Sequence, residues 1–451
     1  MLCKTKLAHL LKLKHMLDIK FIRENPEKVK KAVEDKQLAG TVDVDKLLEL
    51  EQQHRNLLQE VEDIRAERNK LTKQIAEATP ADKETLLKKA GEIKTALSEK
   101  EGSLTQIKTK LDEELLKVPN IIHESVPIGK DESENVVLRK WGGPTEFDFE
   151  PKDHVELGTK LDLIDIETSA EVSGARFNYL KNEAVLLQFA VIQFTFDTLL
   201  DDQIIGKLAE KVESPSAKPF TPILPPAILK AEIAKKMDRF DPIEDRYYFE
   251  EDDVLLAGSA EHTLGPIHMD QTLQAKDLPI RYVGYSTAFR REAGSYGKDT
   301  KGIIRRHQFD KLEMESFTTP EIGLAEQDLM VAIQEYMVQK LEIPYQVVVL
   351  CTGDMGKPDY RQIDIECWMP GEGKYRETHT SDYMTDYQAQ RLEIRYRDGA
   401  KSGFVHMNDA TAFAIGRTLI AILENYQQAD GSVVIPKVLQ KYMGIKTIPA
   451  H

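Results

Sequence analysis

Cysteine is scarce in this 451-residue sequence, which contains only Cys3, Cys351 and Cys367. Structural zinc sites need closely spaced ligands and disulfide frameworks need several cysteine pairs, so we expect neither zinc nor disulfides. Long apolar runs are also missing, because none approaches the roughly 20 residues that a membrane-spanning helix needs. These absences predict a chain that does not span a membrane and folds in a reducing compartment, for which we expect the cytoplasm.

An excess of basic charge is absent as well, since the formal net charge is -15 at pH 7. A generally basic surface is the usual sign of nucleic-acid binding, so any such contact must be local. The glycine patterns of two common nucleotide sites, GxGxxG after a strand and GxxxxGK[ST], are also missing. A nucleotide site in this chain must therefore be built from other elements.

The first 15 residues, MLCKTKLAHLLKLKH, are basic and apolar. Such a segment is compatible with an organelle presequence or with a helix on a membrane surface. It lacks the serine and arginine enrichment of a transit peptide, and Met16 opens a segment that begins like a domain. We therefore treat residues 1–15 as an extension of uncertain status and favour an upstream start or an incidental extension.

Two runs of apolar residues predict a pair of long helices between Val44 and Val118. In both runs the residues recur at alternating spacings of three and four, which is typical of a coiled-coil seam. The break at Thr79–Asp82 contains Pro80, so the helices should fold back on each other as an arm of roughly 50 Å. The seam positions are His54, Leu57, Val61, Ile64, Arg68, Leu71, Ile75 and Ala78, then Leu86, Ala90, Ile93, Leu97, Lys100, Leu104, Ile107, Leu111 and Val118.

The role of this arm stays open at the level of the residues. A dimerisation coil and a rigid spacer explain it as well as a binding arm does. Basic residues flank the seam, and they either form a solvated face or follow a phosphate backbone. These flanking residues are Arg65, Lys70, Lys73, Lys88, Lys89, Lys94, Lys108 and Lys110.

We expect a helical arm domain over residues 16–125, a polar linker over residues 126–150 and a larger domain over residues 151–451. The larger domain mixes helical stretches with alternating strands such as Tyr345–Cys351 and Gln362–Met369. It lacks the regular strand–helix alternation of a parallel sheet. The predicted fold class is therefore α+β, with an antiparallel two-helix coiled coil followed by a mainly antiparallel sheet flanked by helices.

The stretch FRREAGSYGKDTKGIIRRHQFDKLE, residues 289–313, predicts two strands joined by a charged, glycine-rich loop. Strand alternation puts Arg290 and Glu292 on one face, and it puts Arg305, Phe309 and Glu313 on one face of the second strand. Arginine binds phosphate, an aromatic ring stacks on a purine, and a carboxylate holds an amine or hydroxyl. This surface predicts a site for a nucleotide and an amino acid, although an exposed hairpin with interleaved charges explains any single residue. The loop glycines are Gly294, Gly297 and Gly302.

The run AFAIGRTLIAILENY, residues 412–426, predicts a helix and is almost entirely apolar except for Arg417. A buried guanidinium needs a partner, so we expect either an ion pair with a carboxylate such as Glu424 or a bound anion. Upstream, in YRETHTSDYMTDYQAQR, residues 375–391, Glu377 and Thr380 offer oxygen atoms that suit a hard cation such as Mg²⁺.

Residues 289–313 resemble motif 2 of the class II aminoacyl-tRNA synthetases, in the form found in seryl-tRNA synthetases. The resemblance implies that Arg290 bridges the ATP α-phosphate and the serine carboxylate, and that Glu313 binds serine. It further implies that Glu292 contacts the adenine edge, Phe309 stacks on adenine and Arg305 holds phosphates. The other residues implied to surround ATP are Arg291, Glu377, Thr378, His379, Thr380 and Arg417.

Three more segments resemble the same family. GRTLIAILENYQQADGS, residues 416–432, is similar to motif 3, whose arginine, here Arg417, meets the ATP γ-phosphate. Residues 375–391 are similar to a segment that holds Mg²⁺, which implies Glu377 and Thr380 as ligands, although His379 departs from a serine-rich pattern. Phe220–Lys230 resembles motif 1, a helix at the subunit contact.

Two segments resemble the serine-binding positions of the family. Ser259, Ala260 and Glu261 match a threonine-alanine-glutamate segment, with serine keeping the hydroxyl. Thr411 matches a serine-binding hydroxyl, whereas Asp409 stands in place of an amide. Such polar groups would be left unpaired by alanine, which is how a site of this kind selects serine.

The resemblance extends from Met16 onward and implies a homodimeric serine–tRNA ligase that uses ATP and Mg²⁺. Its expected partners are L-serine and tRNA-Ser, with tRNA-Sec as a further candidate, and the arm would contact the tRNA. Two alternatives are an interaction protein that has lost activity and a ligase that loads a carrier protein. The charged motif residues speak against the first, and the long arm speaks against the second.

Overall fold

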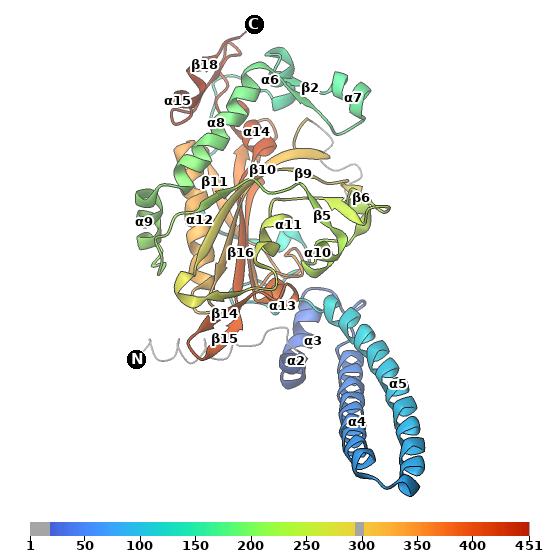
Figure 1. Ribbon diagram of the computed structural model, residues 1–451. Coiled ribbons are helices and arrows are strands. Elements are labelled where there is room, and N and C mark those ends of the chain that lie inside the picture. Colours follow the sequence, from blue (N-terminus) through green and yellow to red (C-terminus); the bar gives the residue numbers. More distant parts are fainter. Residues whose placement is uncertain (1–18, 294–301, 451) are drawn as a thin grey trace. The chain divides into compact units, whose positions relative to one another are not determined.

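The computed structural model describes residues 19–293 and 302–450, and the chain forms two compact units, Leu17–Pro119 and Asn120–His451 (Figure 1). The extension at residues 1–15 lies outside the described residues, and so do Gly294 and Gly297 of the predicted glycine-rich loop. The boundary between the two units falls close to the predicted end of the arm domain.

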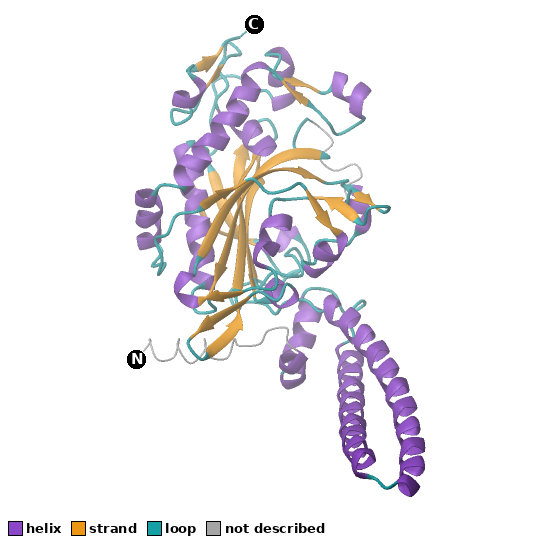
Figure 2. Cartoon of the chain, viewed as in Figure 1, coloured by secondary structure: helices purple, strands orange, loops and turns teal. Residues whose placement is uncertain are grey.

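Two long antiparallel helices form the arm of the N-terminal unit (Figure 2). The described helices of this unit are α2 (Ile19–Glu24), α3 (Pro26–Asp35), α4 (Val44–Glu77) and α5 (Pro80–Lys117). The Asp43 side chain caps α4 by accepting a hydrogen bond from the N–H of Lys46 at 3.0 Å. Pro80 occupies the first turn of α5, where its missing N–H is not needed. The predicted seam is confirmed at Val61, Leu71, Ile93, Leu97 and Leu111, which are buried, whereas Arg68 is exposed.

Some of the basic residues beside the seam pair across the arm. Lys46 lies 2.7 Å from Glu114, Arg65 lies 2.7 Å from Glu101, and Lys89 lies 3.0 Å from Glu67. Exposed pairs of this kind are screened by water and add little to stability. Within the described residues, five of the predicted flanking lysines make no ion pair. They are Lys70, Lys73, Lys88, Lys94 and Lys110.

An eight-stranded sheet forms the centre of the second unit, in the order β1-β11-β12-β13-β16-β10-β9-β4. All of its neighbouring strands are antiparallel except β4 and β9, which confirms the predicted mainly antiparallel sheet. The strands are β1 (Val136–Trp141), β4 (Thr221–Ile223), β9 (Ile280–Phe289), β10 (Gln308–Thr318), β11 (Tyr345–Val349), β12 (Arg361–Met369), β13 (Lys374–Thr385) and β16 (His406–Ala414). Strand β1 lies within residues 126–150, so the segment predicted as a linker contributes an edge strand to this sheet.

Helices pack on one face of the sheet and bury the main apolar core between them and the strands. These helices include α6 (His154–Lys160), α8 (Asn182–Leu199), α9 (Asp202–Lys211), α12 (Gly323–Lys340) and α14 (Ile415–Asn425). Gln334 of α12 donates hydrogen bonds to the carbonyls of Thr380 and Thr411, at 2.7 and 2.8 Å. A buried amide thus holds α12 against β13 and β16, the two central strands that carry predicted site residues.

Smaller elements surround the sheet. The short strands are β2 (Ile164–Asp165), β3 (Tyr179–Leu180), β5 (Ile228–Lys230), β6 (Tyr248–Phe249), β7 (Val254–Leu256), β8 (Thr272–Gln274), β14 (Arg395–Asp398), β15 (Lys401–Phe404), β17 (Val433–Val434) and β18 (Thr447–Ile448). The short helices are α7 (Glu167–Ser173), α10 (Ala231–Lys236), α11 (Glu261–Leu264), α13 (Tyr387–Arg391) and α15 (Gln440–Met443).

Two predicted helices differ from the structure. Phe220–Lys230 was expected to be a helix but contains β4 and β5, and the next helix, α10, begins only at Ala231. Pro222, Pro225 and Pro226 explain this, because proline lacks the N–H that a helix interior requires. The run at residues 412–426 is helical only from Ile415, because its first three residues complete β16.

Among the described helices, none is by itself long and apolar enough to cross a membrane. Helices α8 and α9 meet the length and composition criteria only as a pair, with a bend of 68° between them.

Candidate active site

A cleft of about 470 Å³ lies over β10, β12, β13 and β16, beside the start of α14. It brings together predicted site residues that lie far apart in the chain, from Arg290 to Arg417. Those that line it are Arg290, Glu292, Arg305, Phe309, Glu377, Thr378, Thr380, Thr411 and Arg417. The cleft therefore collects most of the predicted nucleotide site in one place.

The residues around the glycine-rich loop reach the cleft from outside the strands. Arg290 and Glu292 follow the last residue of β9, and Arg305 precedes β10, so the prediction that strand alternation sorts them was wrong. Glu292 instead adopts a left-handed backbone with φ 55°, and its Oε2 lies 2.9 Å from Nη1 of Arg305. The Arg290 guanidinium lies 5.4 Å from the centre of the Phe309 ring. An aromatic face and two guanidiniums thus share one wall, as a purine with phosphates requires.

A β-bulge brings Glu377 and Thr380 to the same face of the sheet. In a regular strand, residues three apart point to opposite faces. Here Glu377 pairs with Glu366 and Thr380 pairs with Asp364, because the register shifts between Ile365 and Glu366. Since Asp364 and Glu366 are two apart on β12, all four oxygen-bearing side chains line the cleft. Bulges often re-aim side chains in this way near active sites.

A second bulge acts in the same way on β16. Glu313 pairs with Thr411 while Lys311 pairs with Ala414, so Ala412 is the extra residue. The shift brings the Thr411 hydroxyl beside the two charged side chains of β10. Lys311 Nζ lies 2.5 Å from Oε2 of Glu313, a pair that is buried.

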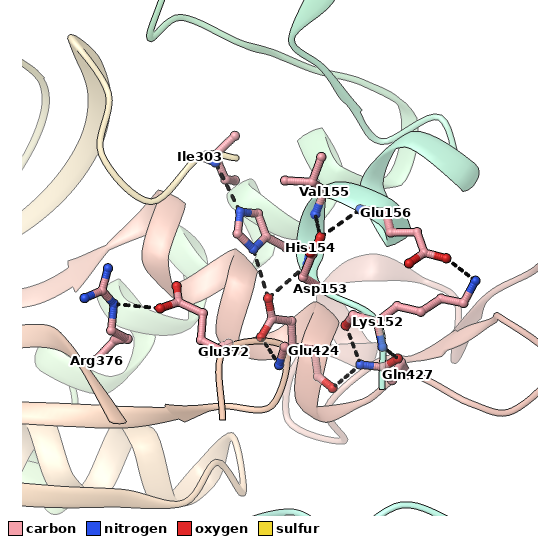
Figure 3. A network of polar contacts seen from close by, with 12 residues as sticks. Lys152, Asp153, His154, Val155, Glu156, Ile303, Glu372, Arg376, Glu424 and Gln427 are labelled. Carbon is pink, nitrogen blue, oxygen red and sulfur yellow. Dashed lines mark hydrogen bonds and ion pairs between the residues drawn. The ribbon is translucent and has the colours of Figure 1, made fainter. Parts of the chain in front are cut away.

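Arg417 finds its partner on β13. Its Nη1 donates to the carbonyl of Glu377 at 2.7 Å and lies 3.1 Å from Oε2 of the same residue. Burial raises the pKa of Glu377, but the charge and hydrogen bond of Arg417, together with the charges of Arg290 and Lys311, lower the pKa overall. The suggested pair with Glu424 was wrong, because Glu424 is buried against His154 at 2.9 Å (Figure 3).

Four other predicted serine-binding residues lie next to the cleft and are buried, namely Ser259, Ala260, Glu261 and Glu313. The hydroxyl of Ser259 donates to Oε2 of Glu313 at 3.0 Å, whereas Oε1 of Glu313 has no hydrogen-bond partner among the described residues. Burial raises the pKa of Glu313. Glu261 lies 2.8 Å from the half-buried Arg239. Burial raises the pKa of Glu261, but the Arg239 charge, together with the Lys311 charge and a hydrogen bond from Gln388, lowers this pKa to about 2. Ala260, between Ser259 and Glu261, is fully buried.

Two residues predicted to bind ATP do not line the cleft. The Arg291 guanidinium lies 5.0 Å from the centre of the Tyr247 ring. His379 packs against Phe413 with ring centres 5.1 Å apart, and burial lowers its pKa to about 3. His379 is therefore a neutral histidine of the core.

Other lining residues were missed by the sequence analysis. Lys311 lies midway between Phe309 and Glu313, so strand alternation could have found it. No pattern in the sequence predicted that Arg306 lines the cleft. It is 5% exposed, and its Nε and Nη2 have no hydrogen-bond partner among the described residues. Burial, together with the nearby Arg176 charge, lowers the pKa of Arg306 to about 10.

A row of three carboxyl groups continues the face of the sheet that carries Thr411 and Glu313. Asp409 pairs with Glu315 of β10 on one side and with Asp382 of β13 on the other. All three are buried, and neither oxygen of Glu315 has a hydrogen-bond partner in the described part of the chain. Burial first, and then the charges of neighbouring carboxylates, hold each pKa well above its usual value. The position where Asp409 replaces an amide thus belongs to a proton-holding row.

The chain resembles known proteins over almost its full length. A serine–tRNA ligase from Dictyoglomus thermophilum is 41% identical, over 96% of this chain and 99% of that protein. This chain belongs to the seryl-tRNA synthetase family. The model of the seryl-tRNA synthetase N-terminal domain matches residues 16–122, and the model of the class II tRNA synthetase core domain (G, H, P, S and T) matches residues 245–426.

Solved structures of the seryl-tRNA synthetase family share this fold. The crystal structure of seryl-tRNA synthetase from Pyrococcus horikoshii complexed with ATP is 41% identical with a TM-score of 0.87, covering 97% of this chain and 100% of the other. The cytoplasmic serine–tRNA ligase from Naegleria fowleri in complex with AMP is 31% identical with a TM-score of 0.83, covering 97% and 99%.

Proposed function

We propose that this chain is a serine–tRNA ligase that activates L-serine with ATP and transfers the seryl group to tRNA-Ser. The strongest support is one cleft that combines Arg290, Arg305, Arg417 and Phe309 with a buried carboxylate, Glu313, beside it. The full-length relatives are named serine–tRNA ligases, and the solved Pyrococcus horikoshii relative is described as complexed with ATP.

In this proposal ATP lies along the wall formed by motifs 2 and 3. Phe309 stacks on adenine, Glu292 contacts its edge, and Arg305 and Arg417 neutralise the outer phosphates. Both arginines already lie within 3.1 Å of a carboxylate, so ATP exchanges one set of charge partners for another. Arg290 lies between the α-phosphate and the amino-acid carboxylate. Arg306 is an additional cation on this wall.

The oxygen atoms around Glu377 suit Mg²⁺. Asp364 Oδ1 is buried without a hydrogen-bond partner among the described residues, and Thr380 lies on the same face of the sheet. No group of three or more His, Cys, Asp or Glu in that part of the chain could hold a metal ion by itself. This fits Mg²⁺, which proteins usually bind through one or two carboxylates together with substrate phosphates and water. Glu377 and Thr380 would hold the ion, which screens phosphate charge when bound.

Serine selection depends on buried polar groups. Glu313 has one oxygen without a partner, which can accept from the substrate ammonium or hydroxyl group, and Ser259 and Thr411 supply hydroxyls nearby. Alanine would leave such groups unpaired, which makes it a poor substrate. Glu261 contributes indirectly, since it is held by Arg239.

The reaction has two steps. An oxygen of the serine carboxylate attacks the α-phosphorus of ATP, and pyrophosphate leaves. The terminal ribose hydroxyl of the tRNA then attacks the seryl carbonyl carbon, and AMP leaves. Both steps are accelerated by positioning and by arginine charges near the reacting phosphate, so no general base is assigned.

The arm would bind tRNA through five flanking lysines that make no ion pair within the described residues, because a phosphate backbone supplies the missing negative charge. They are Lys70, Lys73, Lys88, Lys94 and Lys110. A homodimer is also proposed. It is supported by α8, where Leu186 and Phe189 are 53% and 56% exposed. We place the reaction in the cytoplasm, as for the Naegleria fowleri relative, and tRNA-Sec is a candidate second substrate.

Serine-dependent exchange between pyrophosphate and ATP tests the activation step. We expect exchange with serine and much less with threonine, alanine or glycine, followed by transfer to tRNA-Ser. Absence of exchange with every amino acid would leave an interaction protein as the explanation. Exchange without transfer to any tRNA would favour a ligase that loads a carrier protein.

Variants of the arm test whether tRNA binding and serine activation are carried out by different parts of the chain. Deletion of residues 44–118, or replacement of Lys70, Lys73, Lys88, Lys94 and Lys110 by glutamine, should impair serylation of tRNA and leave exchange intact. Replacement of the ion-paired Lys46 and Lys89 by glutamine is the matched control and should change serylation much less. Loss of exchange in the five-lysine variant would contradict this assignment of the arm.

A further inference from the structure

A buried histidine outside the cleft holds the turn that carries its phosphate-facing groups. Nε2 of His154 accepts a hydrogen bond from the backbone N–H of Ile303 at 3.2 Å (Figure 3). Because that nitrogen accepts, the ring hydrogen is on Nδ1, which lies 2.9 Å from Oε1 of Glu424. Glu424 therefore selects the tautomer that can bind the turn.

The Glu424 carboxylate also accepts hydrogen bonds from the backbone of two segments. Oε1 of Glu424 also accepts from the N–H of His154 at 2.9 Å, and Oε2 accepts from the N–H of Gly371 at 2.8 Å. Glu424 lies on α14, the helix whose first turn contains Arg417, and His154 is the first residue of α6. One buried residue thus joins α6, the turn before β13 and the motif 3 helix (Figure 3).

The turn that His154 holds leads directly to the cleft. Ile303 and Ile304 both line the cleft, and Arg305 follows them. The carbonyl of Ile304 accepts from Nε of Arg417 at 3.4 Å. A shift of this turn therefore moves the backbone that positions both Arg305 and Arg417.

Space around the contact is tight. Gly302 has a φ of 63°, and a Cβ at this position would lie 1.7 Å from Nε2 of His154. The imidazole consequently packs against the Gly302 backbone, and no other residue type fits there without displacing the ring.

We propose that His154, oriented by Glu424, is a positioning residue for ATP. It touches neither substrate nor the cleft, and it acts by fixing the turn at residues 302–306. The inference rests on the proposed function for the identity of the nucleotide. It predicts that loss of the Ile303 contact weakens binding of the outer phosphates of ATP and has little effect on groups shared with AMP.

The test compares two substitutions of His154 in the full-length chain. In His154→Gln, the longer amide can still accept from Ile303, whereas in His154→Asn the amide can donate to Glu424 but is too short to reach Ile303. Gln427→Ala is the control, because Gln427 bonds the backbone of Lys152 and of Glu424 in the same network without touching Ile303 or the Glu424 carboxylate. Calorimetry with ATP and with AMP gives affinities that require neither serine nor tRNA.

We expect His154→Asn to weaken ATP binding roughly three- to tenfold, the effect of one buried hydrogen bond, with AMP binding changed less than about twofold. His154→Gln should recover most of the ATP affinity, and Gln427→Ala should match the unsubstituted chain. Equal loss of ATP and AMP affinity, or unchanged ATP affinity in a folded His154→Asn, would overturn the proposal. If the unsubstituted chain does not bind ATP, the proposed function itself fails.

Discussion

Replacement of Asp409 by asparagine should make the second unit less sensitive to rising pH. Asp409 lies between Glu315 and Asp382 on neighbouring strands, and burial followed by nearby carboxylates raises the pKa of each. A carboxyl whose pKa is raised on folding stabilises the fold fully below the unfolded pKa. That contribution is lost as the pH rises through the folded pKa. The amide introduced by the substitution is uncharged at any pH and could donate to both neighbours.

The expected magnitude follows from proton counting. Unfolded aspartate and glutamate titrate near pH 4. Each proton that only the folded chain retains lowers the free energy of unfolding by about 1.4 kcal/mol per pH unit above that range. Removal of one such group should therefore make the free energy of unfolding of Asp409→Asn exceed that of the unsubstituted chain by an amount that grows by up to about 3 kcal/mol from pH 5 to pH 7. For a unit of this size, that equals an increase in Tm of about 4 °C.

Differential scanning calorimetry at pH 5, 6 and 7 measures this difference. Asp398→Asn is the control, because Asp398 is exposed at the end of β14 and should shift Tm by a small and constant amount. A Tm difference for Asp409→Asn that stays constant, or shrinks, between pH 5 and pH 7 would refute the reasoning.

Three further substitutions probe the cleft. Glu313→Gln should raise KM for serine roughly 10- to 100-fold, as expected for loss of a charged hydrogen bond, and steady-state exchange kinetics should show an unchanged KM for ATP; an equal rise in both would contradict the assignment. Arg306→Met should raise the free energy of unfolding of the ATP-free chain by about 1 kcal/mol or more, because it removes a buried charge without a partner, and a less stable variant in urea unfolding would argue against this account. Gly302→Ala should destabilise the fold by at least about 2 kcal/mol. Gly373 has the same φ of 63° but no neighbour within 4 Å, so Gly373→Ala should lower the free energy of unfolding by only about 1 kcal/mol. Similar melting curves for these two glycine variants would show that the contact with His154 is not tight.

The local pattern of the sequence was sufficient to predict the two-helix arm. Spacings of three and four place apolar residues on one side of each helix, and Pro80 ends the pattern, so α4 and α5 follow from near neighbours alone. The mainly antiparallel sheet was predicted from alternation in the same way. The edge strand β1 was not predicted, because all six of its residues are exposed and show no buried face.

The candidate site was only partly accessible to such reasoning. The resemblance pointed to Arg290, Phe309 and Arg417, and the cleft contains all three. Alternation failed for Glu292 and Arg305, which lie in turns where the backbone does not follow the period of two. His379 was assigned to the cleft by its place in the segment, but it packs in the core.

By itself, the sequence determined the elements whose causes are local: the two-helix arm, the alternating strands and the types of charged residue available for chemistry. The tertiary structure alone decided which of those residues meet. Two bulges bring Glu377 to Thr380 and Glu313 to Thr411, and packing pairs Arg417 with Glu377 while leaving Glu424 for His154. The physical reason is that a register shift or an ion pair depends on strands and helices far apart in the chain, which no local period encodes.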